Sequence, residues 1–453
     1  MSTTDPDIAI IETSSLGDRS YLISHDGVAV VIDPQRDIDR VLALAAEKNA
    51  TITHVLETHI HNDYVTGGLE LARATGAEYV VPEGDPVEYE RRAVGDGDVV
   101  DAGSATFQVM HTPGHTHHHV SYVLQLGDEP IAIFTGGSML YGSTGRTDLL
   151  GSEHTDELTH AQFHSGRRIA AELPADVEVY PTHGFGSFCS ATPTSGDSST
   201  IGEQQQSNPA LTQDEQTYVD ELIAGLSAYP AYYAHMGVIN TEGPAPIDLS
   251  TPEPVDPDEL RRRIDDGQWV VDLRARTAFA AGHLDGSLGF ELSTTFVTYL
   301  GWLYQWGAPL TLIGDTSDQI DEATRELARI GIDHPSGSAV GEIHSLASDG
   351  RVRSYEVSDF AGLAAEDSDI AVLDTRQQSE YADGHIPGAI NIPLHELPHR
   401  LAEVPDGKVW VHCASGYRAS IAASLLDREH RSVVLIDDDY NRATDLGLDT
   451  SKT

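Results

Sequence analysis

The chain has 453 residues, the length of about three average domains, and 40% of them are hydrophobic and 7% aromatic. That content is enough for ordinary hydrophobic cores and excludes wholesale disorder. Acidic residues outnumber basic ones by 72 to 27, which gives a formal net charge of −45. Such a charge argues against binding to nucleic-acid phosphates and against docking on anionic lipid.

The basic residues are almost all arginine. Only Lys48, Lys408 and Lys452 are lysines, and the other 24 are arginines. Acid excess with scarce lysine is what we expect of a halophilic protein, because concentrated salt shortens the range of charge repulsion to a few ångströms. An ordinary acidic protein is the alternative. We therefore interpret the charge as a property suited to the solvent rather than to a substrate.

Cysteine content and the N-terminal segment bear on the cellular compartment. Two cysteines, Cys189 and Cys413, cannot form a disulfide framework in a chain of this size. The segment MSTTDPDIAI is acidic and lacks a basic stretch before an apolar one, so we expect no secretory signal. No apolar run approaches the ~18 residues of a membrane span. The sequence predicts a cytoplasmic protein without a membrane partner.

Short apolar runs alternate with turns and helical segments in the N-terminal part of the chain. Buried strands are predicted at 28–34, 52–59, 78–82 and 131–137. Amphipathic helices are predicted at 37–50, 68–77 and 158–173. This pattern is typical of a layered α/β domain.

The region after these elements is polar at first and then rich in proline. We expect residues 191–209 to form a long loop and a helix at 212–227 to close the domain. Residues 244–260, PAPIDLSTPEPVDPDEL, combine prolines with acidic residues, so we interpret them as a linker.

Two similar segments follow the linker. WVVDLRARTAFAAGHLDGSLGFEL at 269–292 matches AVLDTRQQSEYADGHIPGAINIPL at 371–394. The Asp of D-x-R and the His of Gly-His both recur 102 residues later. We therefore predict two homologous α/β units, which we call the first repeat (255–345) and the second repeat (353–450).

Cys413 lies between the apolar segment KVWVHC and the helix-forming segment ASIAASLLDREH. Unpaired backbone N–H groups at a helix N-terminus favour a thiolate, and Arg418 adds positive charge. Gly416 permits tight curvature, and Ser415 and Gly416 are candidates for contact with the substrate. Four residues separate Cys413 from Arg418, whereas a phosphatase loop of the tyrosine-phosphatase type needs five. We therefore favour sulfur transfer with Cys413 as nucleophile, and a buried structural cysteine is the alternative.

Four segments resemble a rhodanese domain: D-T-R at 374–376, Glu380-Tyr381, GHIPGAINIP at 384–393 and CASGYR at 413–418. The resemblance covers about 353–445. It implies that Cys413 carries the sulfur, that Arg418 and the loop amides cradle an anion, and that Asp374 and Arg376 support the catalytic loop.

Two departures from the rhodanese pattern are visible. The segment IDDDYN at 436–441 stands where rhodaneses usually have glycines. The first repeat offers Gly314 or Asp315 where the cysteine would fall, so it resembles an inactive rhodanese that serves in packing or docking.

Histidines follow three separate strand segments of the N-terminal part. ITHVLETHIHNDY supplies His59, His61 and Asp63, and two later segments supply His115 and His183. Imidazole and carboxylate groups at such positions suit Zn or Fe, so we predict a metal site. Ordinary loop histidines with satisfied hydrogen bonds are the alternative. We place the run 117–119 on the next strand and do not count it among the ligands.

The H-x-H-x-D motif and the later histidines resemble the metallo-β-lactamase fold over about residues 8–230. FTGGSMLYGSTGRTDL (134–149), SSTIG (198–202) and NPAL (208–211) resemble persulfide dioxygenases and glyoxalase-II-type thioester hydrolases. Fusion to rhodanese units is typical of persulfide dioxygenase relatives. The implied fold is α/β, with a metallo-β-lactamase αββα sandwich at 1–243 followed by two α/β rhodanese-like domains at 255–345 and 353–450.

This resemblance has two departures at the metal site. Tyr64 replaces a second-metal ligand, and Gly137 replaces the metal-bridging Asp. Persulfide dioxygenases hold one Fe(II) by two His, which His59 and His115 match, and by that Asp. His59, His61 and His115 would still make a three-His site suited to Zn. The expected cofactor is one divalent metal, Fe(II) or Zn(II).

Three functions remain open from the sequence. The first is oxidation of a low-molecular-weight thiol persulfide to sulfite with O2, coupled to transfer of sulfane sulfur through Cys413, with sulfite or thiosulfate as the other partner. The second is a zinc thioester hydrolase fused to a sulfurtransferase, in which Asp63 or His183 positions water. The third is a metal-poor scaffold with rhodanese activity alone.

Three further points accompany these hypotheses. Arg146 is a candidate either for binding a substrate carboxylate or for a structural ion pair. Cys189 is a candidate sulfur relay, although a buried or loop cysteine is the simpler interpretation. Assembly into a homo-oligomer stays open.

Overall fold

The computed structural model describes residues 5–194, 196–366 and 370–448. The chain divides into two compact units, of which the first runs to Ile247 and also takes in Ala328–Gly331. The second unit starts at Asp248 and contains both repeats. Among the described residues, no helix is long and apolar enough to cross a membrane.

The first unit is built on two sheets. The six-stranded sheet joins, in this order, β1 (Asp7–Thr13), β2 (Asp18–His25), β3 (Val28–Ile32), β4 (Thr51–Leu56), β5 (Glu78–Pro82) and β6 (Arg92–Val94). The five-stranded sheet has the order β11-β10-β9-β8-β7 and comprises β7 (Val99–Ala102), β8 (Ala105–His111), β9 (Val120–Leu126), β10 (Glu129–Gly136) and β11 (Glu178–Pro181).

Apolar side chains from both sheets form the core between them. Tyr21 from β2 packs with Phe134 from β10, with ring centroids 5.2 Å apart, and Phe107 from β8 joins the same cluster. Along β8 the side chains alternate between buried and more exposed positions, which is the pattern of a strand with one face on a core. Burial of each large aromatic side chain contributes roughly 2–3 kcal/mol to this packing.

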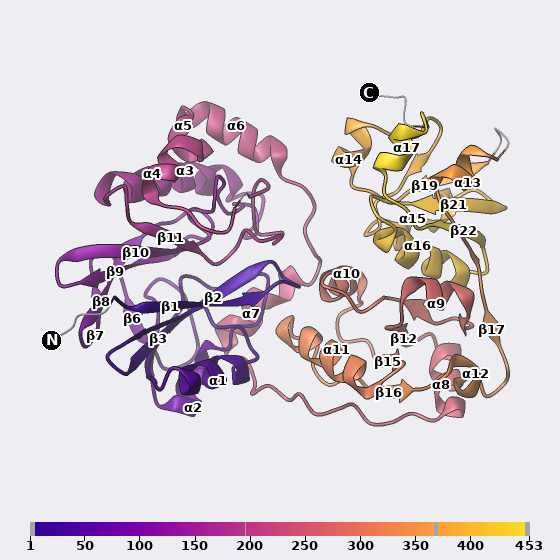
Figure 1. Cartoon of the computed structure of the whole chain (residues 1–453), viewed down its shortest axis with the longest axis horizontal. Coiled ribbons are helices and arrows are strands. Elements are labelled where there is room, and N and C mark those ends of the chain that lie inside the picture. Colours follow the sequence, from indigo (N-terminus) through magenta and orange to yellow (C-terminus); the bar gives the residue numbers. More distant parts are fainter. Residues whose placement is uncertain (1–4, 195, 367–369, 449–453) are drawn as a thin grey trace. The chain divides into compact units, whose positions relative to one another are not determined.

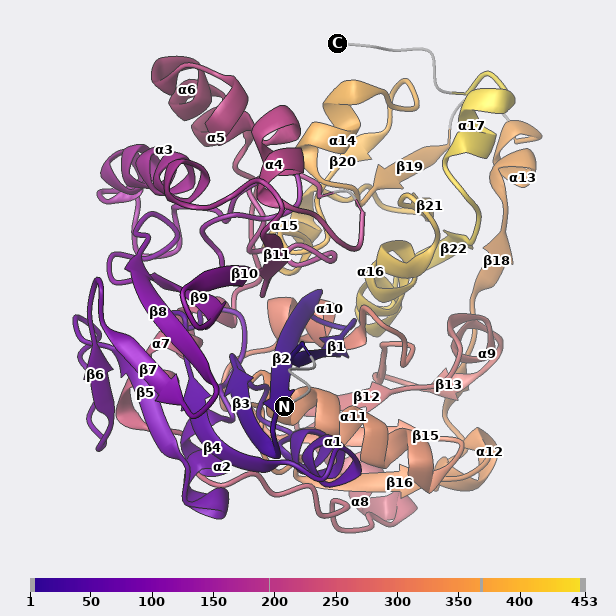
Figure 2. The same ribbon diagram turned by 60° about the vertical axis from the view of Figure 1, so that its left-hand side comes forward.

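Helices cover the outer faces of the two sheets (Figures 1 and 2). On the six-stranded sheet lie α1 (Asp39–Glu47) and α2 (Gly68–Thr75). On the side of the five-stranded sheet lie α3 (Thr155–Glu172), α4 (Ile201–Ser207), α5 (Pro209–Thr212) and α6 (Glu215–Gly225), and α7 (Tyr233–Glu242) follows in the chain. The order helix, sheet, sheet, helix is the αββα sandwich expected from the sequence.

The second unit contains two sheets with only parallel pairings. In the first repeat the order is β14-β12-β15-β16, with β12 (Trp269–Asp272), β14 (Leu288–Gly289), β15 (Leu310–Gly314) and β16 (Gly337–Val340). In the second repeat the order is β18-β22-β21-β19-β20, with β18 (Glu356–Ser358), β19 (Ala371–Asp374), β20 (Ile390–Asn391), β21 (Lys408–His412) and β22 (Ser432–Ile436). A short antiparallel pair joins β13 (His283–Leu284) to β17 (Val352–Arg353).

Helices alternate with these strands, as parallel pairing requires. The first repeat carries α8 (Pro257–Asp265), α9 (Arg276–Ala281), α10 (Phe296–Leu303), α11 (Ser317–Arg329) and α12 (Ile343–Leu346). The second carries α13 (Phe360–Ala364), α14 (Gln378–Asp383), α15 (Leu397–Arg400), α16 (Tyr417–Arg428) and α17 (Asn441–Asp445), with a 3-10 turn at Leu401–Glu403.

Three predictions about local structure are corrected. The predicted loop 191–209 contains α4, because Thr200 and Glu203 form a capping box that starts a helix. The predicted linker 244–260 ends earlier, because Asp256 caps α8 and Pro257 occupies its first turn. The run 117–119 lies in the turn before β9 and not on that strand.

Candidate metal centre and sulfur-transfer loop

Three histidines from three strand ends point their Nε2 atoms toward one place. His59 follows β4, His115 follows β8 and His183 follows β11, and all three are fully buried. Each offers one ring nitrogen to a group whose atoms lie within 4.8 Å of one another. The Nε2 atoms of His59 and His183 are 3.4 Å apart. Nitrogen ligands ~2.0–2.1 Å from a tetrahedral zinc lie at about that mutual distance.

The second nitrogen of each ring is held by a neighbouring group. Nδ1 of His115 donates to the carbonyl oxygen of Arg146 at 2.7 Å, and Nδ1 of His183 faces Asp18 Oδ1 at 2.9 Å. Nδ1 of His59 faces the Thr58 hydroxyl at 2.8 Å. Such contacts fix the ring orientation of metal-ligating histidines.

The buried donor set fits a metal ion. Nε2 of His115 is buried and has no hydrogen-bond partner among the described residues, although an unpaired buried polar atom is costly. Burial lowers the pKa of His115 to about 3 and that of His59 well below its ordinary value, so both rings are neutral and keep a free lone pair. A divalent cation bound by these rings would satisfy that lone pair.

His61 belongs to a different part of the site. Its Nε2 lies 3.0 Å from the Tyr64 hydroxyl, 3.4 Å from Asp33 Oδ1 and 3.3 Å from Glu57 Oε2. Burial opposes charge on this ring, but Asp33 and Glu57 raise the pKa of His61 to about 9. The structure therefore groups His183, and not His61, with His59 and His115, while His61 forms two further candidate groups, one with Asp63 and His183 and one with Asp33 and Glu57.

Asp63 connects the two parts. Its Oδ2 lies 3.1 Å from Nδ1 of His183, on the side where Asp18 also contacts that ring. Burial opposes charge on both groups, but their mutual attraction lowers the pKa of Asp63 and raises that of His183 well above its ordinary value. Metal binding at Nε2 of His183 would therefore release a proton from this ring. Asp63 thus orients His183, and one of its oxygens has no partner among the described residues.

The imidazole ring of His115 occupies the space beside Gly137 where a side chain would lie. A Cβ atom at Gly137 would lie 2.3 Å from Cδ2 of His115. The backbone N–H of Gly137 donates to Nε2 of His119 at 2.9 Å, and the His119 ring stacks on His59 with centroids 4.8 Å apart. His119 therefore supports the site from behind, and the room for a carboxylate side chain at position 137 is taken by His115.

Arg146 makes a structural ion pair. It is buried and binds Asp148 with both Nε, at 2.6 Å, and Nη2, at 2.7 Å, and it donates to the carbonyl oxygens of Phe188 and Ser227. These contacts use its donors for joining loops, which favours the structural alternative over substrate binding.

Cys189 is a buried free thiol near the metal site. Burial raises its pKa well above the ordinary value, and Asp63 and Asp18 add to the shift. Its Sγ lies 3.9 Å from the Tyr233 hydroxyl. A protonated thiol is a poor nucleophile, so the structure favours the simpler interpretation of this cysteine.

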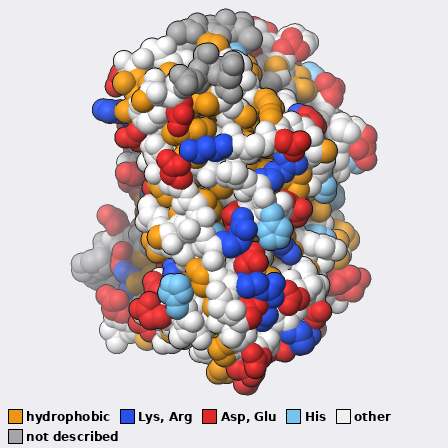
Figure 3. Space-filling model, turned by 90° about the vertical axis from the view of Figure 1, so that its right-hand side faces the viewer, with side chains coloured by type: hydrophobic (Ala, Val, Ile, Leu, Met, Phe, Trp, Pro, Cys, Tyr) orange, Lys and Arg blue, Asp and Glu red, His pale blue; other side chains and the backbone are white. Residues whose placement is uncertain are grey.

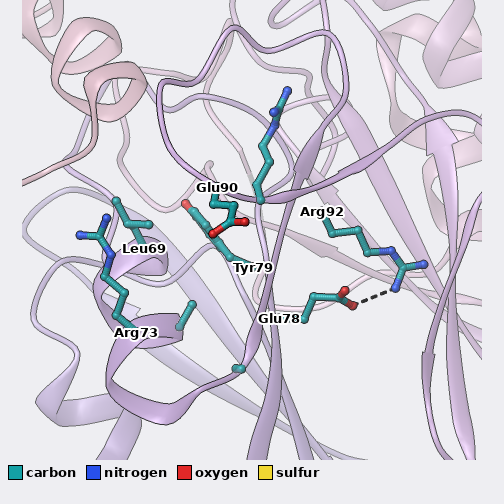
Figure 4. Close-up of a pocket in the computed structure, with 9 residues that line it drawn as sticks. Leu69, Arg73, Glu78, Tyr79, Glu90 and Arg92 are labelled. Carbon is teal, nitrogen blue, oxygen red and sulfur yellow. Dashed lines mark hydrogen bonds and ion pairs between the residues drawn. The ribbon is translucent and has the colours of Figure 1, made fainter.

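A surface groove of about 460 Å³ lies elsewhere in the first unit, lined by Leu69, Ala72, Arg73, Ala77, Glu78, Tyr79, Glu90, Arg91 and Arg92. Figure 4 shows Arg73 and Arg92 on opposite sides of the groove, and Arg92 is paired with Glu78 at 2.9 Å. Because the guanidinium groups do not converge, we do not assign an anion site to this groove.

The second repeat presents Cys413 at the end of β21, immediately before α16. Gly416 caps α16 with φ +88°, a left-handed conformation that suits glycine. Cys413 is 2% exposed, so the thiol is nearly enclosed by the loop of residues 413–418, which we call the Cys413 loop. The first backbone N–H groups of α16 begin at this loop, where the sequence leads us to expect an anion cradle.

Two ion pairs frame the Cys413 loop. Arg418 binds Glu380 with both terminal nitrogens, at 2.5 and 2.8 Å. Arg376 binds both oxygens of Asp374 and donates to the carbonyl oxygen of Gly384 at 2.8 Å. Asp374 and Arg376 pair mainly with each other, an arrangement that fits the supporting role expected of them. Ser415 lies within the loop.

The first repeat has a different loop at the equivalent place. Strand registers place Asp272 opposite Ile313 and Asp374 opposite His412, so Gly314 is the counterpart of Cys413. The backbone N–H of Asp315 donates to Oε1 of Gln319 at 2.7 Å. The first repeat therefore fills its own cradle with an amide side chain.

A narrow pocket opens beside the Cys413 loop and is lined by both repeats: Tyr299, Trp302 and Leu303 from the first, and Gln377, Leu394, His395 and Arg418 from the second. The rings of Trp302 and His395 stack with centroids 4.9 Å apart. The first repeat thus supplies an apolar wall beside the Cys413 loop.

Comparison with protein families matches two parts of the chain. Residues 18–183 match the Metallo-beta-lactamase superfamily, and residues 357–444 match the Rhodanese-like domain. The chain contains a metallo-beta-lactamase domain and a rhodanese-like domain. The mixed α/β fold class predicted from the sequence is confirmed, and the histidine cluster lies in the metallo-beta-lactamase domain.

Individual relatives agree with the first of these domains. A hydroxyacylglutathione hydrolase of Aliivibrio fischeri (strain MJ11) is 36% identical over 163 residues, which are 36% of this chain and 59% of the relative. The chain thus spans about three fifths of the length of the curated relatives it matches.

Solved structures extend the likeness. A metallo-beta-lactamase structure from Staphylococcus aureus subsp. aureus COL has 29% identity and a TM-score of 0.68, and the match covers 75% of this chain and all of that one. ETHE1 from Myxococcus xanthus has 28% identity and a TM-score of 0.45 over 52% of this chain and 98% of that one.

Sequence reasoning missed several residues of the metallo-beta-lactamase domain. Asp33 directly follows β3, and Glu57 and His59 follow β4. These positions at one edge of the sheet indicate from the sequence that Asp33 and Glu57 lie near the histidines. Asp18 starts β2 and gave none, because its contact with His183 spans 165 residues. His119 stands in a run of three histidines, and nothing in the sequence distinguishes it from His117 and His118.

Proposed function

We propose that this chain is a sulfur-handling enzyme whose rhodanese-like domain transfers sulfane sulfur through Cys413. The observation that carries the proposal is the seat of Cys413 between β21 and the left-handed Gly416 at the start of α16. Backbone N–H groups at that place favour a thiolate and an anionic donor.

The transfer has two steps. The Cys413 thiolate attacks the outer sulfur of thiosulfate, the sulfur–sulfur bond breaks, and sulfite leaves with the electron pair. A second thiolate then attacks the outer sulfur of the Cys413 persulfide and releases the Cys413 thiolate. The pocket beside the loop, with Tyr299 and Trp302 on one side, suits a low-molecular-weight thiol as the second partner.

We propose that the metallo-beta-lactamase domain binds one divalent metal through His59, His115 and His183. When bound, the metal would supply a Lewis acid with an open coordination position. Asp63 orients His183 and holds a proton acceptor next to it, and burial of the whole cluster excludes bulk water. Oxidation of a small-thiol persulfide to sulfite is the first candidate reaction, because its product and its substrate are both ligands of the rhodanese step.

Zinc-dependent hydrolysis of a thioester is the second candidate. Two observations favour it. The ligand group consists of three histidines, and position 137 offers no carboxylate because the His115 ring fills the space of a side chain there. The curated relatives are named hydroxyacylglutathione hydrolases. The 2-His-1-carboxylate set typical of non-heme iron oxygenases is not completed by residue 137.

Metal content and two assays separate the candidates. Iron with persulfide-dependent O2 uptake supports oxidation, whereas zinc with hydrolysis of acyl-thiols supports the second candidate. His115→Ala should remove most of the metal, and His164→Ala is the matched control because His164 is exposed on α3. Equal metal content in the two variants would contradict the ligand assignment. If the protein binds no metal but still transfers sulfur from thiosulfate to cyanide, the third hypothesis is supported, a scaffold with rhodanese activity alone.

We further propose that the acidic surface adapts the protein to concentrated salt. Figure 3 shows acidic side chains spread among basic ones over one face of the molecule rather than gathered in a patch. Repulsion within a charge of −45 weakens with screening, so the unfolding temperature should rise steeply from low salt to molar salt. A flat salt dependence in thermal unfolding would contradict this proposal.

A further inference from the structure

One arginine of the first repeat reaches the surroundings of the Cys413 loop. Nε of Arg276 donates to Oδ1 of Asp437 at 2.8 Å, and its Nη1 donates to Oε2 of Glu291 at 2.6 Å. Arg276 starts α9, and the residue 102 positions later in the second repeat is the neutral Gln378. The contact is therefore a feature of the first repeat and not of the repeated frame.

Asp437 is packed directly on the Cys413 loop. A Cβ atom built on Gly416 would lie 2.2 Å from Oδ1 of Asp437, the same oxygen that binds Arg276. Three residues later, the backbone N–H of Tyr440 donates to the carbonyl oxygen of Ala414 at 2.8 Å. The acidic segment that departs from the rhodanese pattern thus puts a carboxylate beside the anion cradle.

Charged and titratable groups surround the loop. They are Arg418 and Tyr417 on α16, Glu380 on α14, Asp374 at the end of β19 with Arg376 after it, His412 at the end of β21, Asp437 and Tyr440 after β22, Arg276 on α9, Glu291 after β14 and Tyr299 on α10. Glu380 already neutralises Arg418, and Asp374 already neutralises Arg376. The carboxylates of Asp437 and Glu291 are not neutralised by Arg418 or Arg376, and Arg276 binds both of them.

We propose that Arg276 is a positioning residue for sulfur transfer, which compensates Asp437 so that the Cys413 loop can accept a dianionic donor. The inference rests on the proposed sulfurtransferase function. Without Arg276, two carboxylates would stand near the cradle with no cation between them, and they would repel thiosulfate before it reaches Cys413.

A second connection between Arg276 and the Cys413 loop runs through Glu291. The Tyr417 hydroxyl donates to the carbonyl oxygen of Glu291 at 2.8 Å, and Tyr417 directly follows Gly416. Arg276 binds the carboxylates of Asp437 and Glu291, and each of these two residues contacts the Cys413 loop. The first repeat therefore acts on catalysis through charge placement, although its own loop lacks a cysteine.

The experiment compares two sulfur donors of different charge, thiosulfate as a dianion and benzenethiosulfonate as a monoanion, with cyanide as acceptor. Arg276→Gln should raise KM for thiosulfate roughly tenfold at low screening, with a smaller effect on the monoanion and on kcat. Added salt should reduce the difference. Arg276→Lys should rescue most of the loss, and Asp437→Asn combined with Arg276→Gln should restore the KM for thiosulfate.

Arg353→Gln is the matched control. Arg353 also lies between the two repeats: it binds Asp427 on α16 of the second repeat at 2.7 Å and approaches Asp285 of the first repeat at 3.7 Å. Among the described residues it makes no contact with the Cys413 loop. It should leave KM for both donors unchanged. Equal losses in the Arg276 and Arg353 variants, or equal losses for both donors, would overturn the inference. Activity that survives Cys413→Ser would instead overturn the proposed function itself.

Discussion

The two repeats of the second unit share a frame and differ in their loops. In both, the Asp of D-x-R binds the Arg two residues later, and that Arg donates to a glycine carbonyl oxygen at 2.8 Å, Gly282 in the first repeat and Gly384 in the second. In both, the histidine after that glycine donates from Nδ1 to a carbonyl oxygen, at 2.8 and 3.0 Å. The repeats thus keep the same buried polar anchor.

The main difference lies in the loop that follows β15 in the first repeat and β21 in the second. The second repeat has Cys413, Arg418 and Glu380, whereas the first has Gly314 and Gln319 at the first two places. Because the anchor persists where the reactive residues are lost, the Asp–Arg pair serves the fold, and the chemistry depends on the loop. The pairing of Asp374 with Arg376 therefore fits a role in structural support.

The largest effect should come from making the second loop resemble the first. Cys413→Gly removes the nucleophile, and we expect thiosulfate-to-cyanide transfer to fall by at least ~10³-fold. Cys189→Ser should retain activity, since Cys189 lies in the other unit with a protonated thiol. Transfer that depends on Cys189 and not on Cys413 would reverse the assignment.

The second prediction tests whether the anchor is shared. Asp272→Ala and Asp374→Ala each leave a buried arginine without its partner, which should cost about 3–5 kcal/mol of unfolding free energy. Denaturant unfolding of the two variants should show similar losses. A loss confined to Asp374→Ala would show that the pair in the first repeat contributes little, and would break the comparison.

The sequence predicts this shared frame well but not what fills the two loops. The 102-residue spacing identified both anchors, because short-range motifs fix local contacts such as Asp374 with Arg376. The spacing leaves both Gly314 and Asp315 as candidates for the counterpart of Cys413. The strand register identifies Gly314. The same limit applies to the metal site: motif spacing found the histidines, but the choice of His183 over His61 depends on how three distant strand ends meet.

The third prediction adds a thiol to the first repeat. Gly314→Cys in a Cys413→Ser background should yield a thiol that alkylates slowly, because Gln319 Oε1 occupies the cradle and would lie 3.1 Å from the new Cβ. Adding Gln319→Ala should raise the alkylation rate severalfold by freeing the Asp315 N–H group. Equal rates with and without Gln319 would show that the amide does not block the cradle.

The smallest effect concerns the pair that only the second repeat has. Burial opposes charge on Glu380, but Arg418 lowers its pKa below the ordinary value of 4.5. A lowered folded-state pKa means that the stabilisation is present above about pH 4.5 and is lost as pH falls through the lower folded value. Glu380 is partly exposed, so the contribution is below ~1 kcal/mol.

Glu380→Gln should therefore lower the unfolding free energy slightly at neutral pH and converge with the parent protein in strong acid. Ala278 occupies the place of Glu380 in the first repeat, so the first repeat should show no matching acid-dependent loss. Denaturant unfolding from pH 7 to pH 3 provides the measurement. A difference between variant and parent that grows toward low pH would have the wrong sign, and would show that Arg418 does not hold Glu380 ionised. In that case the positive charge of Arg418 would be free for the sulfur donor, and the compensation of Asp437 by Arg276 would matter less.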